Sequence, residues 1–186
     1  YSWQTIGSMA DLDAATLDDV KTWFRSWYGP NNAVLVLAGD IDVATAKEKV
    51  TRYFGDIPAS ATLADMKTHI PKHAQDTRET IPDRVPQVRL YRGWPVAEMG
   101  TRDAALLDLF AQVLGGSAAS RFDTRLVHGD KIADQASAYQ WSSEISGTFF
   151  LVSTVKEGVD PAKVEKALDE ELERLIAEGP TADELE

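Results

Sequence analysis

The sequence predicts an α+β fold in which helices pack on one face of a mixed or antiparallel sheet. Segments with apolar residues three and four positions apart occur along the chain, as in helices that bury one face. Other segments are short and have strand character, and two of them, 131–141 and 146–155, lie on either side of Ser142-Ser143-Glu144. This arrangement is typical of an antiparallel hairpin, which a layer of helices can cover.

Composition restricts the class of protein further. The chain has 186 residues, of which 44% are apolar and 26% charged, as in a soluble globular protein of one or two domains. Its net charge of -11 argues against nucleic acid as a partner, because phosphate binding depends on Lys and Arg. No apolar run is long enough for a membrane span. The absence of cysteine excludes disulfides and thiolate metal sites.

The first helix is expected from Leu17 to about Trp27, after an entry loop over 1–15. Thr16 suits the N-cap position, because its hydroxyl can accept a hydrogen bond from a free amide of the first turn. Asp18 and Asp19 would lie in that turn, where the helix dipole favours negative charge. The spacing of the apolar residues predicts one buried stripe, formed by Leu17, Val20, Trp23, Phe24 and Trp27.

The apolar run 33–38 predicts an interior strand between two turns. Turn-forming residues precede the run at 28–32, and Gly39-Asp40 follows it. Asp42 can cap a second helix, which would end near Phe54 because Gly55 and Pro58 follow. The residues expected on the inner face of this helix are Ala46, Val50, Tyr53 and Phe54.

A linker between two domains is expected over 59–80, because this stretch has no sustained period and mixes small, charged and proline residues. It contains His69 and His73, whose spacing is that of zinc ligands on a helix. Pro71 lies between them and disfavours such a helix, and no Glu stands beside either His as a base. We interpret both as exposed histidines, and the chain offers no metal ligand or catalytic residue.

The second domain is expected over 81–186 and opens with an alternating strand over 85–96. Val88, Leu90 and Trp94 would share one face of this strand. Thr101 can cap the next helix, which runs to about Leu114 and is apolar on nearly every side. We therefore expect this helix to be the most buried element.

Two more helices are expected in the same domain. Ser117 can cap one that ends near His128, with Phe122 and Leu126 facing inward. The other begins at Asp160-Pro161 and ends at Gly179-Pro180, with an apolar stripe formed by Val164, Ala167, Leu168, Leu172, Leu175 and Ile176. Thr181 and Glu184 have the spacing of a capping box, but no helix follows them.

Several short motifs follow one another along the chain: Leu17-Asp18-Asp19-Val20, Tyr28-x-Pro-Asn-Asn, the run 35–42 and Tyr53-Phe54-Gly55-Asp56-Ile57-Pro58. Further motifs lie at 87–94, at Leu114-Gly115-Gly116 with Ser120-Arg121, and at 133–138. In this order they resemble the pitrilysin/insulinase family of metallopeptidases with an inverted zinc motif. The resemblance covers nearly the whole chain and implies a metallopeptidase-like α/β sandwich.

The resemblance implies zinc in the parent protein and none in this chain. Catalysis in the family rests on H-x-x-E-H, where the two His and a downstream Glu bind zinc and the inner Glu activates the bound water. The histidines here, His69, His73 and His128, neither begin nor end such a motif. In the family's order the motif lies upstream of the position that corresponds to Tyr1.

The resemblance also implies which part of the parent protein this chain represents. Residues 1–58 would be the end of the preceding, zinc-bearing domain, 59–80 a linker, and 81–186 a second, non-catalytic domain truncated at its end. In the second half of active members, an Arg after Ser-Arg and a Tyr seven residues later contact the substrate. The matching positions are Val127 and Asp134, which argues against a direct substrate role for this segment and favours the first half.

The implied function is that of a non-catalytic part of a zinc-dependent metalloendopeptidase, which walls the substrate chamber while the parent hydrolyses peptides or small unfolded proteins. Its partners would be the missing catalytic domain, the second half of the parent chain and peptide substrates. One alternative is part of an inactive paralogue that serves as a structural or partner subunit of a heteromeric peptidase. Another is a free-standing module that binds basic peptides.

Two further expectations concern charge and location. Residues 157–186 contain eleven acidic and three basic residues. We interpret them first as solvated helix faces and second as a surface for basic peptides. Resemblance to bacterial members favours the periplasm over the cytoplasm.

Overall fold

The computed structural model describes residues 4–61 and 66–185. The chain divides into two compact units, Tyr1–Asp65 and Met66–Glu186. This division falls inside the stretch 59–80 that the sequence predicts as a linker, and the described residues of that stretch form neither helix nor strand.

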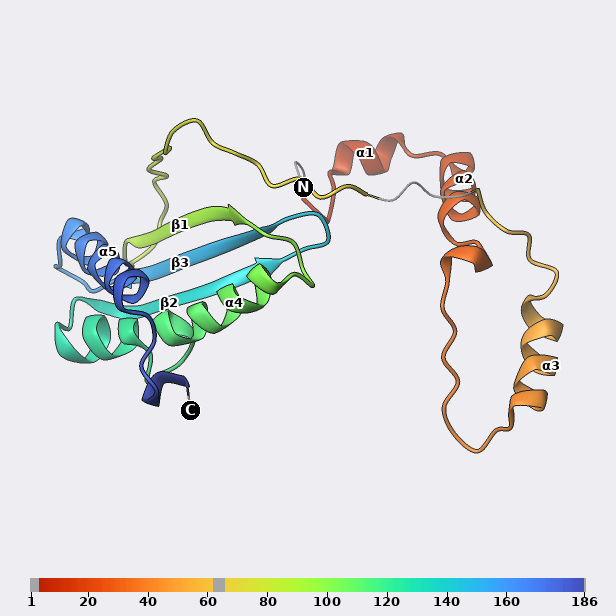
Figure 1. Ribbon diagram of the computed structural model, residues 1–186. Coiled ribbons are helices and arrows are strands. Elements are labelled where there is room, and N and C mark those ends of the chain that lie inside the picture. The colour runs from red at the N-terminus through yellow and green to blue at the C-terminus, as the bar shows by residue number, and fades with distance from the viewer. Residues whose placement is uncertain (1–3, 62–65, 186) are drawn as a thin grey trace. The chain divides into compact units, whose positions relative to one another are not determined.

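The first unit contains the helices α1 (Met9–Ala14), α2 (Leu17–Trp27) and α3 (Val43–Phe54), and a 3-10 turn, η1 (Pro30–Asn32) (Figure 1). The predicted N-caps are confirmed. The Thr16 hydroxyl accepts from the Asp19 amide at 3.2 Å, and the Asp42 carboxylate accepts from the Thr45 amide at 2.9 Å. Helix α1 was missed, because its six residues are too few to show a period and only its Ser8 cap marks it.

The prediction of an interior strand at 33–38 is wrong for this structure. These residues lie outside any helix or strand, and the side chains of Val34 and Val36 are 92% and 79% exposed. A strand forms only where a neighbouring strand supplies hydrogen-bond partners. The described residues of the first unit contain helices and no strand, so the apolar run has nothing to pair with.

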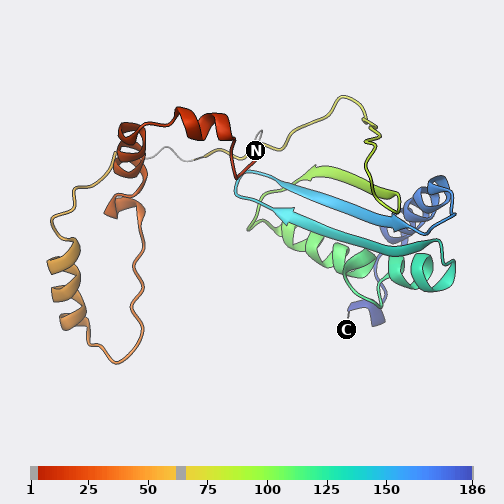
Figure 2. The same ribbon diagram turned by 180° about the vertical axis from the view of Figure 1, so that it is seen from behind.

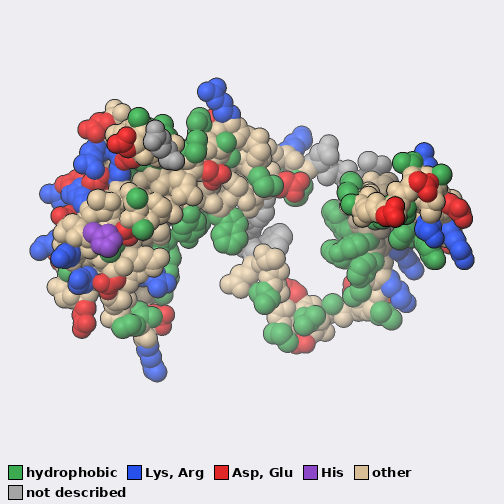
Figure 3. Space-filling model, turned by 90° about the horizontal axis from the view of Figure 1, so that it is seen from below, with side chains coloured by type: hydrophobic (Ala, Val, Ile, Leu, Met, Phe, Trp, Pro, Cys, Tyr) green, Lys and Arg blue, Asp and Glu red, His purple; other side chains and the backbone are tan. Residues whose placement is uncertain are grey.

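The stripe on α2 is also exposed rather than buried. Leu17, Val20, Trp23, Phe24 and Trp27 are between 46% and 68% exposed. Some of the aromatic rings contact one another: Trp23 and Phe24 have ring centroids 5.5 Å apart, and Phe24 and Tyr28 have theirs 4.8 Å apart. On α3, Ala46 and Val50 are half-buried, but Tyr53 and Phe54 are exposed. Apolar side chains therefore lie on the surface of this unit (Figure 3).

One long-range contact within the first unit is fixed by polar groups. The Ser60 amide donates to the Asn31 side-chain oxygen at 2.8 Å, and the Asn31 side-chain nitrogen donates to the Ser60 carbonyl at 3.2 Å. Gly29 lies so close to Ser60 that a β-carbon at Gly29 would overlap it. The turn before the apolar run therefore holds the chain that follows α3.

The described part of the second unit forms a three-stranded antiparallel sheet in the order β1-β3-β2 (Figure 1). Its strands are β1 (Arg89–Val96), β2 (Ala133–Ser142) and β3 (Gly147–Val155). Strands β2 and β3 form the predicted hairpin, and β1 pairs with the other edge of β3. The register places Trp94 and Gln140 on either side of Phe149. The predicted α+β class is thus confirmed, with an antiparallel sheet.

Helices cover one face of this sheet, as Figures 1 and 2 show. They are α4 (Arg102–Ala111), the π-helical turns η2 (Gln112–Gly116) and η3 (Asp123–Gly129), and α5 (Pro161–Glu178), followed by a 3-10 turn, η4 (Asp183–Leu185). The predicted caps Thr101 and Asp160 accept hydrogen bonds from Ala104 and Ala162. These local bonds explain why the two helix starts could be placed from the sequence.

The core lies between the sheet and the helices. Several apolar side chains there are at most 1% exposed: Leu114, Phe122, Leu126, Leu151, Val164 and Leu168. Leu107 and Phe110 of α4 are partly buried against this core. The opposite face of the sheet carries Tyr91, Tyr139 and Trp141, which are exposed.

The structure corrects three predictions for the second unit. Helix α4 is not buried on all sides, because Leu106 and Leu109 are 51% and 58% exposed. The helix after η2 begins at 121 rather than after Ser117, and the hydroxyl of Ser120 accepts from the Asp123 amide at 3.4 Å. Ile176 at the end of α5 is exposed. For α4 and Ile176, the apolar content was visible in the sequence, but the covering partner was not.

None of the helices in the described ranges is long and apolar enough to cross a membrane.

Candidate functional site

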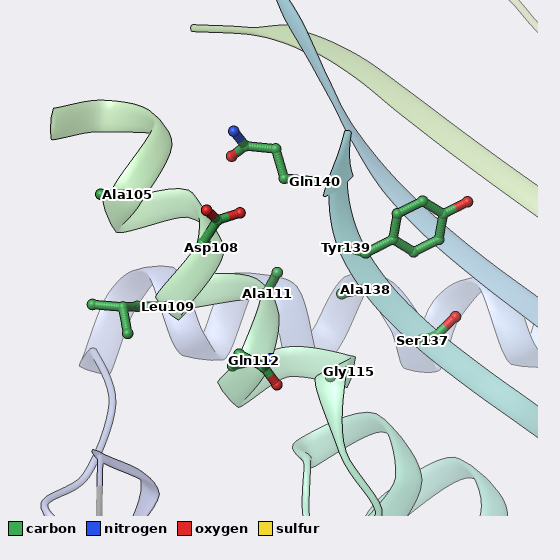
Figure 4. Close-up of a pocket in the computed structure, with 11 residues that line it drawn as sticks. Ala105, Asp108, Leu109, Ala111, Gln112, Gly115, Ser137, Ala138, Tyr139 and Gln140 are labelled. Carbon is green, nitrogen blue, oxygen red and sulfur yellow. The ribbon is translucent and has the colours of Figure 1, made fainter. Parts of the chain in front are cut away.

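A groove of about 870 Å³ lies between α4 with η2 on one side and the edge strand β2 on the other (Figure 4). The helical wall and its glycine end come from residues 105–116, and the strand wall from residues 137–140. The lining residues are Ala105, Asp108, Leu109, Ala111, Gln112, Gly115, Gly116, Ser137, Ala138, Tyr139 and Gln140. This volume lies within the usual range of ligand pockets, about 300–1,000 Å³.

Strand β2 presents an unpaired backbone edge to this groove. In the turn of the hairpin, the Ser143 amide donates to the Ser146 carbonyl at 3.1 Å, so this pair is hydrogen-bonded. Antiparallel pairs alternate between bonded and non-bonded. Counting back through the register, Ser137 and Tyr139 bond to β3, whereas Ala138 and Gln140 direct their amide and carbonyl groups away from it.

The other side of β3 gives the same assignment. The Val155 amide donates to the Val88 carbonyl at 2.9 Å. Because bonded pairs alternate, the odd-numbered residues of β3 form their backbone hydrogen bonds with β1. The even-numbered residues, including Phe150 and Val152, are then left for β2. In the described ranges 4–61 and 66–185, no backbone bond outside the β2–β3 pairing reaches residues 136–141. The edge of β2 is therefore open at Gln140, whereas Ala138 is only 3% exposed because η2 lies against its backbone.

Small residues let the helical layer approach β2 at one end of the groove. A β-carbon at Gly115 would collide with the backbone nitrogen of Ala138, so the close packing of η2 on β2 requires glycine there. Ala136 and Ala138 on the inner face of β2 are buried and leave little side-chain bulk. Toward Gln140 the strand and α4 are separated by the groove.

Two polar side chains point into the space between α4 and β2, and Figure 4 shows both. The carboxylate of Asp108 extends from α4, and the side-chain amide of Gln140 extends from β2. Tyr139 and Ser137 project on the far side of the strand. The groove thus combines a free strand edge with a small number of polar groups, a common composition for binding sites.

Ion pairs join two other helices of the second unit, η3 and α5. Glu171 of α5 is fully buried, and its carboxylate accepts from Arg125 of η3 at 3.0 Å and from Arg174. Arg125 also pairs with Glu170 and Asp130, and the hydrogen bond with Glu170 is the main reason that the pKa of Arg125 is raised. A buried carboxylate without such partners would be very costly, so η3 and α5 are fixed to each other.

A second clamp attaches the chain after α5. Arg121 is nearly buried and donates from Nε and Nη2 to the two carboxylate oxygens of Glu184, at 2.7 and 2.8 Å. This hydrogen bonding lowers the pKa of Glu184 to about 2. The Thr181 hydroxyl and the Glu184 amide complete the capping box expected from the sequence, and the short turn η4 follows Thr181.

The histidines considered in the sequence analysis do not meet at one site. His69 and His73 lie in the segment before β1, where there is no helix, and the His69 amide donates to the Ile145 carbonyl at 2.9 Å. His128 lies in η3, with Nε2 3.0 Å from an Asp123 carboxylate oxygen. The residues of the described ranges form no group of three His, Cys, Asp or Glu suited to a metal ion. The surroundings of these three histidines therefore do not fit a zinc ion.

The two positions that the family resemblance associates with substrate also lie away from the groove. Val127 is half-buried in η3, and Asp134 at the start of β2 accepts a hydrogen bond from Gln87. The groove itself was not predicted, and the sequence analysis places the residues that line it in a buried helix, at the glycine end of that helix and in a strand.

Comparison with known proteins identifies the family. A profile described as the peptidase M16 inactive domain matches residues 14–186. The chain belongs to the peptidase M16 family. This confirms the family resemblance stated from the motifs, and the matching domain of M16 proteins is the non-catalytic one.

Several relatives are known. The chain is 24% identical over 178 residues to the zinc protease PqqE of Helicobacter pylori, a match that covers 94% of this chain and 40% of the relative. Among solved structures, a protease from Helicobacter pylori superposes with a TM-score of 0.78 at 24% identity, covering 98% of this chain and 45% of that one.

Two more solved structures share the fold. The peptidase M16 inactive domain from Pseudomonas fluorescens has a TM-score of 0.81 at 19% identity, and the match covers all of this chain and 44% of that one. The first half of the periplasmic protease PqqL from Escherichia coli has a TM-score of 0.66 at 20% identity, with 98% and 40% covered. The chain therefore spans less than half the length of these proteins.

Proposed function

We propose that this M16 chain is the non-catalytic part of a zinc-dependent metalloendopeptidase and forms part of the wall of its substrate chamber. The parent protein would hydrolyse peptides or small unfolded proteins. The proposal is supported by the family match and by a relative named as a zinc protease. Zinc would be bound elsewhere in the parent protein, because the described residues here do not suit it.

The observation that carries a role in peptide binding is the open edge of β2 beside α4. An extended peptide can join a sheet at such an edge, where its backbone bonds to the strand and its side chains enter the adjoining groove. Gln140 offers amide and carbonyl groups there, and the groove has space for side chains. The chain would thus hold a stretch of substrate without cutting it.

The exposed apolar surface of the first unit supports a second part of the proposal. The helix α2 and the run 33–38 expose aromatic and aliphatic side chains that a free soluble protein normally covers. We propose that they pack against the catalytic domain and the second half of the parent protein, with 1–58 as the end of the preceding domain. A periplasmic location is proposed by analogy with PqqL.

Hydrogen exchange measured by NMR tests the strand addition. The probe is a blocked peptide of about ten residues in which Thr and Val alternate around one central Lys, long enough for an ordinary strand. Its addition should slow exchange of the Gln140 amide, which faces the groove. The amides of Ser137 and Tyr139 should change little, because they already bond to β3.

Two N-methylated versions of the peptide provide matched controls. Methyl groups on every second amide should leave binding intact, because the peptide can direct them away from β2, whereas methyl groups on all of its amides should abolish binding. Equal binding by both versions, or unchanged exchange at Gln140 in a saturated complex, would refute strand addition. In the whole parent protein, a chelator should stop peptide hydrolysis and added zinc should restore it.

A further inference from the structure

The groove contains hydrogen-bond acceptors that lack donors. The Asp108 carboxylate is exposed, and no hydrogen bond or ion pair reaches it from the described part of the chain. The side-chain oxygen of Gln140 is buried and has no partner there, although its nitrogen donates to Ser142. Both groups line the same groove, one from each wall (Figure 4).

These two acceptors define the chemistry of a complementary side chain. A group that satisfies both must donate several hydrogen bonds, and one that also neutralises Asp108 must be positive. The Lys ammonium and the Arg guanidinium have donors and no acceptors, so they meet both conditions. Asp108 is the only charged residue among those that line the groove, so no basic side chain of the wall competes for it.

We propose that the groove selects extended peptides that place a Lys or Arg side chain between Asp108 and Gln140. This inference rests on the proposed addition of a peptide strand to β2, and it names the class of peptide. Side chains of directly paired residues in neighbouring strands point to the same face of a sheet. The residue paired with Gln140 would therefore direct its side chain toward α4, where Asp108 lies.

The same geometry predicts a dependence on position within the peptide. Adjacent residues of a strand point to opposite faces, so a Lys moved by one residue would point to the face that carries Tyr139. Methyl groups on the outward-facing amides prevent the peptide from compensating by a shift of one residue. We call a peptide with methyl groups on its outward-facing amides a pinned peptide. Such a peptide should bind more tightly when its Lys is one of the residues that bond to β2.

Fluorescence anisotropy with labelled pinned peptides tests the proposal on the full chain. The peptide with central Lys should bind about fivefold more tightly than its norleucine counterpart, which corresponds to about 1 kcal/mol. Asp108→Asn should remove this preference, so that the Lys and norleucine peptides bind this variant equally. Asp103→Asn is the matched control, because Asp103 lies on the same helix outside the groove and the preference should persist.

The outcomes separate the two proposals. If the Lys and norleucine peptides bind equally to the unaltered chain, or if Asp108→Asn keeps the preference, the basic specificity is wrong although the groove still binds peptides. If no peptide binds and the exchange of Gln140 is unaffected, the proposed strand addition itself fails. Loss of the preference in Asp103→Asn as well would show a general effect of net charge and would overturn the role of Asp108.

Discussion

Replacement of Glu184 by alanine should release the chain after α5 from the rest of the second unit. In the structure, the Glu184 carboxylate accepts two hydrogen bonds from Arg121, whose side chain is only 8% exposed. The alanine variant would leave this guanidinium with the Gly179 carbonyl as its remaining acceptor, at 3.0 Å. Arg121 would then be buried with unsatisfied donors unless the turn η4 moves away.

The size of the effect follows from the degree of burial. Removal of one partner from a fully buried ion pair costs about 3–5 kcal/mol, whereas exposed pairs contribute about 0–1 kcal/mol. The side chains of Arg121 and Glu184 are 8% and 25% exposed, which places this pair between the two limits. We expect the free energy of unfolding to fall by about 2 kcal/mol at neutral pH.

The effect should depend on pH in a defined direction. The hydrogen bond with Arg121 lowers the pKa of Glu184 from its ordinary value of 4.5 to about 2 in the folded protein. The unfolded chain therefore takes up the proton first as the pH falls. The contribution of Glu184 is complete above pH 4.5 and disappears as the pH falls from 4.5 toward 2.

Urea unfolding at a series of pH values measures both parts of this prediction. The gap in unfolding free energy between the natural chain and Glu184→Ala should be largest at neutral pH and close as the pH falls. Asp183→Ala is the control, since Asp183 is an exposed neighbour and should shift the free energy by at most about 0.5 kcal/mol. A gap that stays constant with pH, or an equal loss in Asp183→Ala, would refute the clamp.

Three other predictions follow from the core, the histidines and the first unit. Phe122→Ala should lower the unfolding free energy by about 3–5 kcal/mol, because its side chain is fully buried. Leu106→Ala, at an exposed position on α4, should lower it by less than about 1 kcal/mol. Similar urea midpoints for the two variants would contradict the packing. Residues 1–186 should retain no stoichiometric zinc after dialysis and cleave no peptide, and a zinc ion lost on replacement of His69 or His73 would overturn this. The amides of 33–38 should exchange faster than those of β3, and equally slow exchange in a monomer would argue against the open run.

The helix starts could be predicted because they depend on nearby residues. Thr16, Asp42, Thr101 and Asp160 each accept a hydrogen bond from an amide two or three residues later. Such a bond needs no distant partner, so a short stretch of sequence contains all the information that specifies it. The hairpin was similarly visible, because alternation within 131–155 and the short turn between its strands are both local features.

Burial was predicted less well, because it depends on residues far away in the chain. Val34 and Trp23 belong to clear apolar patterns, but no described element covers either side chain. By contrast, Phe122 and Leu126 have no richer local pattern and are completely buried in the core of the second unit. A pattern shows which side could be covered, and only the arrangement of partners decides whether it is.

The groove was missed because it depends on a strand that has a neighbour on one side only. Hydropathy places Ala136 and Ala138 on an inner face, but it does not indicate that β2 is the edge strand. The one available signal was the run of small residues on β2 together with Gly115-Gly116, which allows a helix to approach the strand at one end. That close approach fixes where α4 starts to diverge from β2, and it leaves Gln140 opposite Asp108 with space between them. Addition of a peptide strand would use the same unpaired groups that make an exposed edge prone to unwanted association.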